Sequence, residues 1–267
     1  MNKKIVRTIA LLIAFALIAS VLAVGVSYVF AANEQAQIDA SEKKVQEQQK
    51  KIKDINDKQA LTAENILALY ENKEKIYGNN NPLRIEIGCG KGDFVCQKSK
   101  KEPNYNYVAI EKIADVSTLA TENYARDRGL GDLAANGGWQ TPDGKIYPLG
   151  EVVDFGDLDL GNVRFTVGDA KELLPTLPDS CCDAIYVNFC DPWPKKGHTK
   201  RRLTYIEFLK MYSRLLTPDG KFYFKTDNRP LFDFSLEEVE KAPFTLEYHT
   251  FDLHNSEMDA ENIRTEY

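Results

Sequence analysis

Apolar residues along this chain are grouped in two different ways, and the change falls near residue 60. Residues 9–30 form an uncharged stretch rich in Leu, Ile, Val and Ala, preceded by three positive charges. This stretch is close to the roughly 20 residues that cross a bilayer. With its positive flank it predicts a signal peptide or membrane anchor over residues 1–32, and the remainder exported. Residues 33–60 are polar and lack Gly and Pro, which predicts a helical stalk or linker.

From residue 61 onward, short apolar runs alternate with amphipathic stretches. The runs predict strands at 83–87, 107–110, 163–167, 184–189 and 221–225, with another near 244–250. The amphipathic stretches predict helices at 61–77, 94–101, 113–128, 170–177 and 204–216. Strands separated by helices predict an α/β domain over 61–267 with a mostly parallel, doubly wound sheet. Residues 129–161 interrupt the alternation with many Gly and Asp, which predicts a long surface insertion.

The charge of the chain is unevenly distributed. The formal net charge is −6, yet residues 191–229 contain ten Lys or Arg against four Asp or Glu. A concentrated positive stripe on an acidic protein is the electrostatic footprint of a polyanion-binding surface. On charge alone, a solvated charged surface explains the stripe equally well.

The five cysteines argue against a secreted disulfide framework. Two of them, Cys181 and Cys182, are adjacent, and the C-x-x-C spacing of zinc and redox sites does not occur. This cysteine usage is typical of a reducing compartment, so we expect the domain over 61–267 in the cytoplasm. That expectation conflicts with the membrane-anchored or exported location that residues 1–32 predict.

A glycine-rich loop follows the first predicted strand. Glu86 begins the loop motif at the end of the strand, and Gly88 and Gly90 allow a tight turn that lets a ligand approach the backbone. Glu111 ends the second strand and suits the hydroxyl groups of a ribose, while Asp169 follows the third strand and suits an adenine amino group. Together they predict an adenosine-containing cofactor. Since an acid at the loop would repel a pyrophosphate and attract an amino group, S-adenosylmethionine is favoured over a dinucleotide.

The loop after the fourth predicted strand has an unusual composition. Residues 188–196 read NFCDPWPKK and place Asp191 beside an aromatic ring at the carboxyl end of a strand, where open α/β sheets bind ligands. A cluster of basic residues follows. After the fifth strand come the residues KTDNR, and the chain ends with NIRTEY.

These motifs, in this order, resemble the bacterial tRNA (guanine-N7)-methyltransferases. The similar segments are GNNNPLRIEIGCGKGDF, VAIEK, NVRF with a later DA, NFCDPWPKKGHTKRRL, FKTDNRPLF, DLH and NIRTEY, which together span about 77–267. The resemblance implies a Rossmann-like methyltransferase fold, S-adenosylmethionine as cofactor and tRNA as substrate. It also implies methylation at N7 of guanine 46 in the variable loop, without a metal ion.

The resemblance also assigns roles to individual residues. By matching motif positions, the cofactor is expected to contact Glu86, Gly88, Gly90, Glu111, Asp169 and Asp191, and Asp191 is also the family's catalytic position. The expected tRNA contacts are Lys195, Asp227, Thr265, Glu266 and Tyr267. Phosphate contacts are expected from Lys196, Lys200, Arg201 and Arg202.

The sequence departs from the family in three places. Residues 1–60 have no counterpart in it, and the insertion at 129–161 is longer than expected. The family motif continues beyond Tyr267, so we expect the final strand of the sheet to be missing. These departures leave an alternative open, namely a membrane-tethered or incomplete homologue that binds RNA or S-adenosylmethionine without turnover.

Overall fold

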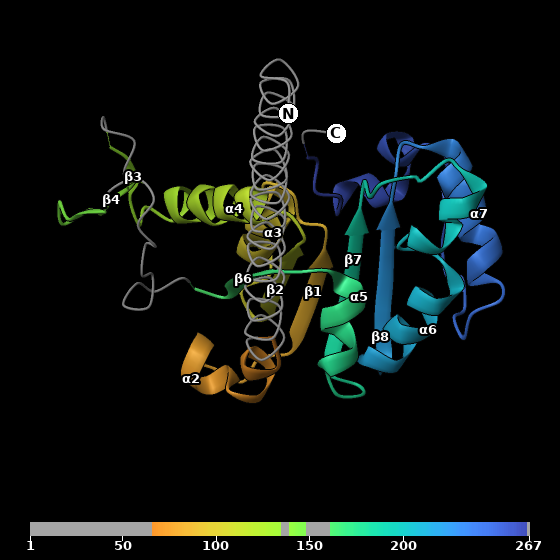
Figure 1. Ribbon diagram of the computed structural model, residues 1–267, viewed down its shortest axis with the longest axis horizontal. Helices are drawn as coiled ribbons and strands as arrows, with labels where there is room; N and C mark the ends of the chain where they lie inside the picture. The colour runs from red at the N-terminus through yellow and green to blue at the C-terminus, as the bar shows by residue number, and fades with distance from the viewer. Residues whose placement is uncertain (1–65, 135–138, 148–160, 266–267) are drawn as a thin grey trace, which may run out of the picture. The chain divides into compact units, whose positions relative to one another are not determined.

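The computed structural model describes residues 66–134, 139–147 and 161–265 (Figure 1). The membrane anchor predicted over 1–32 and the stalk over 33–60 lie outside these residues, as do Glu266 and Tyr267. None of the helices within the described ranges is long and apolar enough to cross a membrane.

Five parallel strands form the central sheet. They are β1 (Leu83–Ile87), β2 (Asn106–Glu111), β6 (Val163–Val167), β7 (Cys182–Asn188) and β8 (Leu216–Lys225). Their order is β6-β2-β1-β7-β8, and each neighbouring pair is parallel. β2 and β6 therefore lie on one side of β1, and β7 and β8 lie on its other side. The doubly wound parallel sheet predicted from the sequence is confirmed.

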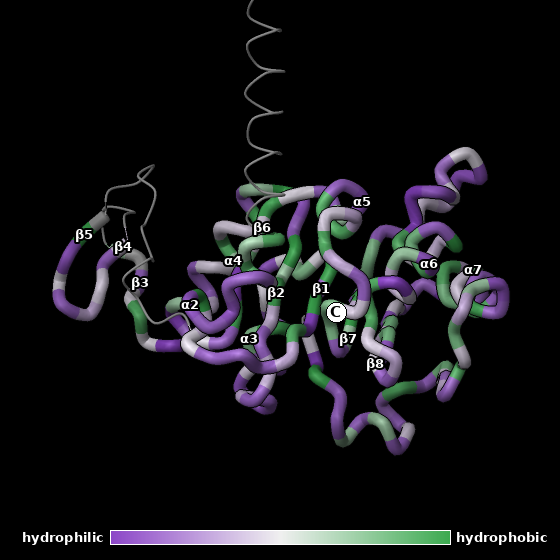
Figure 2. The backbone as a smooth tube through the Cα atoms, turned by 90° about the horizontal axis from the view of Figure 1, so that it is seen from below, coloured by the Kyte–Doolittle hydropathy of each residue, from purple (hydrophilic) through white to green (hydrophobic). Residues whose placement is uncertain are grey.

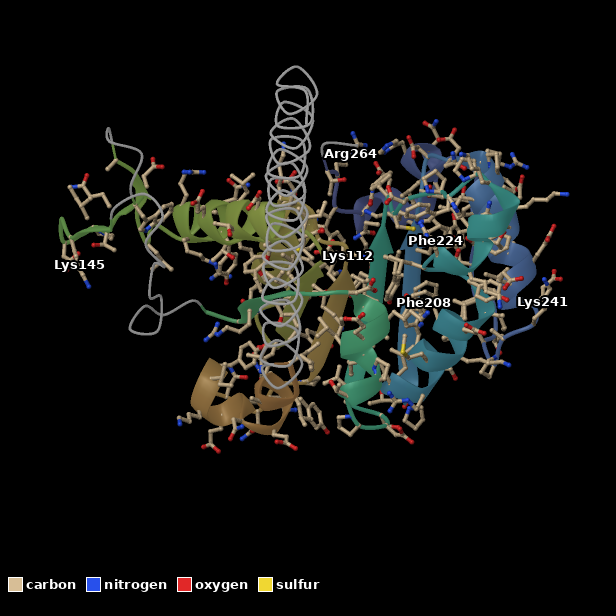
Figure 3. The ribbon with its side chains drawn as sticks, in the orientation of Figure 1. Lys112, Lys145, Phe208, Phe224, Lys241 and Arg264 are labelled. Atoms are coloured by element: carbon tan, nitrogen blue, oxygen red, sulfur yellow. The ribbon has the colours of Figure 1, made fainter. Side chains whose placement is uncertain are left out.

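Helices cover both faces of this sheet. Alternate strand residues contribute to two buried clusters, as expected when successive side chains point to opposite faces. One cluster packs against α5 (Ala170–Leu173) and α6 (Ile206–Leu215), and the other against α3 (Asp93–Lys101) and α4 (Ala114–Asp127). Figure 2 shows hydrophobic residues along β1 and β2 in the middle of the domain, and Figure 3 shows Phe208 and Phe224 in the layer between β8 and α6.

Several predicted helices are shorter than expected, each for a local reason. Residues 66–71 are helical, a turn at Asn72 follows, and α2 (Lys73–Tyr77) ends at Gly78 in the left-handed conformation. Pro175 lies within a 3₁₀ turn, η2 (Leu174–Thr176), that follows α5. The sequence analysis missed α7 (Arg229–Val239). Two sequence features mark the start of this helix. Asn228 is its N-cap and accepts a hydrogen bond from Leu231 N at 2.9 Å, and a proline follows in the first turn.

The strand predicted near residues 244–250 is wrong. The segment has no strand structure, although its residues alternate between apolar and polar. It contacts β8 through side chains, with Phe244 against Phe222 at 6.0 Å between ring centroids and Glu247 paired with Lys221 at 2.6 Å. Within the described residues β8 therefore pairs only with β7 and forms an edge of the sheet. Two short 3₁₀ turns follow, η4 (Leu253–Asn255) and η5 (Glu257–Ala260).

The insertion at 129–161 contains structure that the sequence did not predict. Three two-residue strands, β3 (Asp132–Leu133), β4 (Trp139–Gln140) and β5 (Ile146–Tyr147), pair antiparallel. Trp139 is 3% exposed, and Arg126 of α4 pairs with Asp132 at 2.6 Å. These strands are too short to produce a periodic pattern, and for this reason the segment resembled an unstructured loop.

Candidate active site

The glycine loop is built between the ends of β1 and β2. The amides of Gly88 and Cys89 donate to the carbonyl of Ile110 at 2.8 and 3.1 Å. Gly88 and Gly90 have φ values of +72° and +54°, a region that side chains other than glycine rarely adopt. A Cβ atom added at either position would meet no atom within 4 Å. The loop is therefore open on one side, which suits close approach by a ligand.

Two carboxylates at the next strand ends line the same edge. Glu111 accepts from Gly90 N and from Ile113 N, both at 3.0 Å, so its side chain fixes the loop. Asp169 accepts from Lys171 N at 2.9 Å and pairs with Lys112 at 2.7 Å. Burial opposes ionisation of Asp169, but these two hydrogen bonds hold its pKa below the ordinary value. In Figure 3 Lys112 lies at the edge of the sheet where the strand arrows end.

Glu86 is the most deeply buried acid of the site. It is 1% exposed, and its Oε1 accepts from the side chain of Asn188 at 3.1 Å. Its Oε2 is buried and has no hydrogen-bond partner within the described residues. Burial raises the pKa of Glu86 to about 7, against the opposing effects of Asn188 and Lys225. A buried carboxylate oxygen without a partner is costly, so this site is suited to a cationic or hydrogen-bond-donating group.

The loop after β7 is held in an unusual conformation. Phe189 and Trp193 have positive φ values of 51° and 41°, although neither is glycine. Arg202 braces the loop by donating to the carbonyls of Pro192 at 3.0 Å and Trp193 at 3.2 Å. Asp191 lies exposed within this stiffened turn. Backbone strain of this kind is frequent at functional sites.

Most of the predicted phosphate-binding residues lie on one exposed turn. Lys195 precedes a 3₁₀ helix, η3 (Lys196–Arg201), and the exposed basic residues of this stretch are Lys195, Lys196, Lys200 and Arg201. Arg201 lies over the ring of Trp193, with its guanidinium carbon 4.9 Å from the centroid. Arg202 differs because it is half-buried and uses its guanidinium to hold the loop.

The last described residues return to the glycine loop. Ile263 is 2% exposed and packs in the cluster that contains Cys89 and Phe94. Lys225, at the end of β8, donates to Asn262 Oδ1 and to the Ile263 carbonyl, both at 3.0 Å. The hydroxyl of Thr265 is buried and has no hydrogen-bond partner within the described residues. Thr265, which the resemblance assigns to a tRNA contact, belongs to the segment that Ile263 and Lys225 attach beside the glycine loop.

Asp227 lies at a pocket beside this edge. The pocket has a volume of about 290 Å³ and is lined by Thr226, Asp227, Arg229, Phe232, Thr250, Phe251 and Leu253. Phe251 is 58% exposed, which is high for a large apolar side chain, and Arg229 lies 4.0 Å from its ring centroid. An exposed aromatic ring and a carboxylate at one pocket are suited to a planar base with N–H donors.

Three residues of the site were not assigned from the sequence. Asn188 and Lys225 are the last residues of β7 and β8, and Glu86 is the last but one of β1, so a search for polar residues near strand ends could have found them. Asn262 carries no such signal, because its contact with Lys225 depends on the return of the chain. Four of the five cysteines are buried, and Cys190 is partly exposed.

Comparison with known proteins identifies the family of the chain. Residues 80–267 match a family model described as "Putative methyltransferase". The tRNA (guanine-N(7)-)-methyltransferase of Lachnoclostridium phytofermentans is 38% identical over 223 residues, which covers 81% of this chain and 90% of the relative. The enzyme of the same description from Brevibacillus brevis is 37% identical, covering 76% of this chain and 81% of the relative. The chain belongs to the tRNA (guanine-N(7)-)-methyltransferase family.

Likeness to solved structures is weaker. The precorrin-6y C5,15-methyltransferase of Geobacter metallireducens GS-15 aligns at 14% identity with a TM-score of 0.41, covering 66% of this chain and 72% of that one. This likeness is too low to add to the family assignment.

The residues of this methyltransferase fit S-adenosylmethionine, the cofactor that the family implies. The unpartnered oxygen of Glu86 suits the amino group, and the open side of the glycine loop suits the adjoining chain of the cofactor. Glu111 retains lone pairs for ribose hydroxyls, and Asp169 follows the end of β6 and caps α5. Along the sheet edge the acids lie in the order Asp169, Glu111 and Glu86, which is compatible with the adenine, ribose and amino-group roles predicted for them.

Proposed function

We propose that this chain transfers the methyl group of S-adenosylmethionine to N7 of a guanine in tRNA, at position 46 of the variable loop. The observation that supports this most directly is the 38% identity across 90% of a tRNA (guanine-N(7)-)-methyltransferase. The acids at the carboxyl edge of the sheet are consistent with it, since they suit the cofactor and leave the loop of Asp191 free for the substrate.

The chemistry demands positioning more than proton transfer. S-adenosylmethionine supplies an electrophilic methyl group when bound. Guanine N7 carries a free lone pair at neutral pH, so the protein needs no strong base there. Methylation makes the ring cationic, and the carboxylate of Asp191 would stabilise that growing charge. The bracing of its loop by Arg202 holds the carboxylate in place before reaction, which lowers the cost of alignment.

The substrate would be held on two surfaces. The pocket beside Asp227 would take the extruded guanine, with Asp227 accepting from the N–H groups of the Watson–Crick edge and Phe251 stacking on the ring. The exposed residues Lys195, Lys196, Lys200 and Arg201 would contact phosphates. We assign Arg202 a supporting role, since its donors already bind loop carbonyls.

Product analysis tests this proposal. The full-length protein is incubated with an unmodified tRNA transcript and methyl-labelled S-adenosylmethionine, and the RNA is digested to nucleosides. We expect the label in 7-methylguanosine. Label in 1-methylguanosine or N2-methylguanosine would contradict the proposed atom, and cofactor binding without label in tRNA would favour a non-catalytic binding protein.

Replacing Glu111 with alanine should weaken cofactor binding. The change removes the ribose acceptor and the two hydrogen bonds that fix Gly90 and Ile113. We expect a loss of roughly 1.5–3 kcal/mol in binding free energy, the scale of a hydrogen bond to a charged group. Calorimetric titration with S-adenosylhomocysteine measures it, and Glu207→Ala on the exposed face of α6 is the matched control. Equal affinity of the two variants would refute the ribose assignment.

Binding of tRNA should depend on salt through η3. The double variant Lys200→Ala with Arg201→Ala should flatten the slope of log affinity against log salt by roughly one to two units, if each residue releases about one counterion. Arg202→Ala should leave the slope nearly unchanged, since its guanidinium binds loop carbonyls. The control is Lys210→Ala with Lys241→Ala, two exposed lysines on and beside other helices. If the control pair altered the slope and the η3 pair did not, tRNA would bind to a surface other than η3.

A further inference from the structure

Glu86, Asn188 and Lys225 form a line across three neighbouring strands. In the sheet register Glu86 lies opposite Tyr186, two residues before Asn188 on β7, and Asn188 lies opposite Lys225. The three side chains therefore share one face of the sheet, the face that α3 covers. Asn188 donates to Glu86. Burial raises the pKa of Glu86 and lowers that of Lys225, and the attraction between their opposite charges offsets each of these shifts in part.

Lys225 carries its charge in a confined position. Its ammonium lies 5.2 Å from the ring centroid of Phe94 and 5.9 Å from that of Phe189. Desolvation lowers the pKa of Lys225, so its hydrogen bonds to Asn262 and Ile263 matter for keeping the charge. The lysine thus connects the cofactor acid on one side to residues 262–265 on the other.

Residues 262–265 are attached to the cofactor loop by more than this lysine. Ile263 packs in the buried cluster that contains Cys89 and Phe94, and the side chain of Gln97 on α3 donates to the Arg264 carbonyl at 3.2 Å. In Figure 3 Arg264 lies at the edge of the sheet to which the strand arrows point. The same segment carries Thr265, one of the residues expected to contact tRNA.

We propose that Lys225 is a positioning residue that couples cofactor binding to the placement of the substrate-contacting segment 262–265. The proposal rests on the proposed function for the identity of the two ligands. A cationic amino group arriving at Glu86 competes with Lys225 for the same carboxylate. The Lys225 ammonium then depends more on its hydrogen bonds to Asn262 and the Ile263 carbonyl. These stronger hydrogen bonds hold segment 262–265 more firmly against the end of β8. Cofactor binding therefore favours the conformation that meets tRNA.

The coupling is measured as the change in tRNA affinity on saturation with S-adenosylhomocysteine, which keeps the amino group and cannot react. For the full-length wild-type protein we expect tRNA to bind at least about fivefold more tightly, the lower end of ordinary couplings between sites. Lys225→Met should reduce the factor to below about twofold, while Lys225→Arg should restore part of it. The matched control is Lys221→Met, on the same strand and face but paired with Glu247 at the surface.

Hydrogen–deuterium exchange gives a second readout that needs no tRNA. S-adenosylhomocysteine should slow exchange in residues 257–265 of the wild type and of Lys221→Met, but not of Lys225→Met. If Lys225→Met fails to fold, Asn262→Leu removes the same hydrogen bond from the other side and should show the same losses. Full coupling and unchanged exchange response in Lys225→Met or Asn262→Leu would overturn the proposal. Wild-type protein that forms 7-methylguanosine without any coupling would overturn it too, and would leave the proposed function standing.

Discussion

Replacing Asp191 with alanine is expected to lower the rate of methyl transfer roughly 10²–10³-fold, the usual effect of removing one electrostatic contact to a transition state. The carboxylate lies exposed on a turn between two residues of positive φ, and Arg202 braces the backbone of that turn. Its charge matters most when the guanine ring becomes cationic, which happens only during reaction. The loss should therefore appear in kcat, with little change in the Kd for tRNA.

Single-turnover kinetics with excess protein measure this effect without product release. Asp191→Asn keeps the shape of the side chain and loses the charge, so it should share most of the loss. Asp219→Ala, at an exposed position of β8, is the control and should react at the wild-type rate. If Asp191→Asn transferred methyl groups at the wild-type rate, the shape of the Asp191 side chain and not its charge would account for its role.

Replacing Glu86 with glutamine is expected to have two opposite effects. The buried carboxylate has a pKa of about 7 against an ordinary value of 4.5. Between these values the folded state binds more protons than the unfolded state, so the free energy of unfolding falls as pH rises through this window. By pH 8 the buried charge costs about 3 kcal/mol. Glutamine removes that cost and should raise the free energy of unfolding at pH 8 by about 1–3 kcal/mol.

The same change should cost roughly 2–4 kcal/mol of cofactor binding, because the amino group loses a buried charged partner. In the wild type, affinity for S-adenosylhomocysteine should rise roughly five- to tenfold between pH 6 and pH 7.5 as Glu86 ionises. The charged groups that face Glu86 are Lys225 from β8 and Asp93 from α3, which act on its pKa in opposite directions.

Denaturant unfolding at pH 5 and pH 8, together with calorimetric titration, checks both effects of Glu86→Gln. The stability gain should vanish at low pH, where the wild-type carboxyl is protonated as well. Glu257→Gln, on the exposed side of η5, is the control and should alter neither quantity. Destabilisation by Glu86→Gln at pH 8 would mean that the charge is compensated without the cofactor.

The sequence predicted those parts of the fold that depend on local pattern. Apolar runs located the five strands, and glycines after the first run located the loop at Gly88 and Gly90. The segment 244–250 shows the limit, since alternation alone does not supply a neighbouring strand to pair with. Helix α7 was missed because its N-cap, Asn228, was interpreted only as part of a functional motif.

Roles within the site were harder to predict than its location. Acids at strand ends could be found because parallel strands bring their carboxyl ends to one edge. The sequence could not show that Arg202 braces the loop while Arg201 is exposed. The two residues are adjacent and carry the same charge, and only the conformation of the turn gives their side chains different directions. The link from Lys225 to Asn262 joins residues 37 apart and depends on the path of the intervening chain.

The central claim is methyl transfer to N7 of guanine 46, and an atom-specific substrate pair tests it most directly. Two otherwise identical tRNAs carry either guanine or 7-deazaguanine at position 46, the latter with a carbon in place of N7. Full-length protein and labelled S-adenosylmethionine should modify the guanine tRNA and yield 7-methylguanosine, and should leave the 7-deazaguanine tRNA unlabelled. Equal labelling of the two tRNAs, or labelling of neither, would contradict the account.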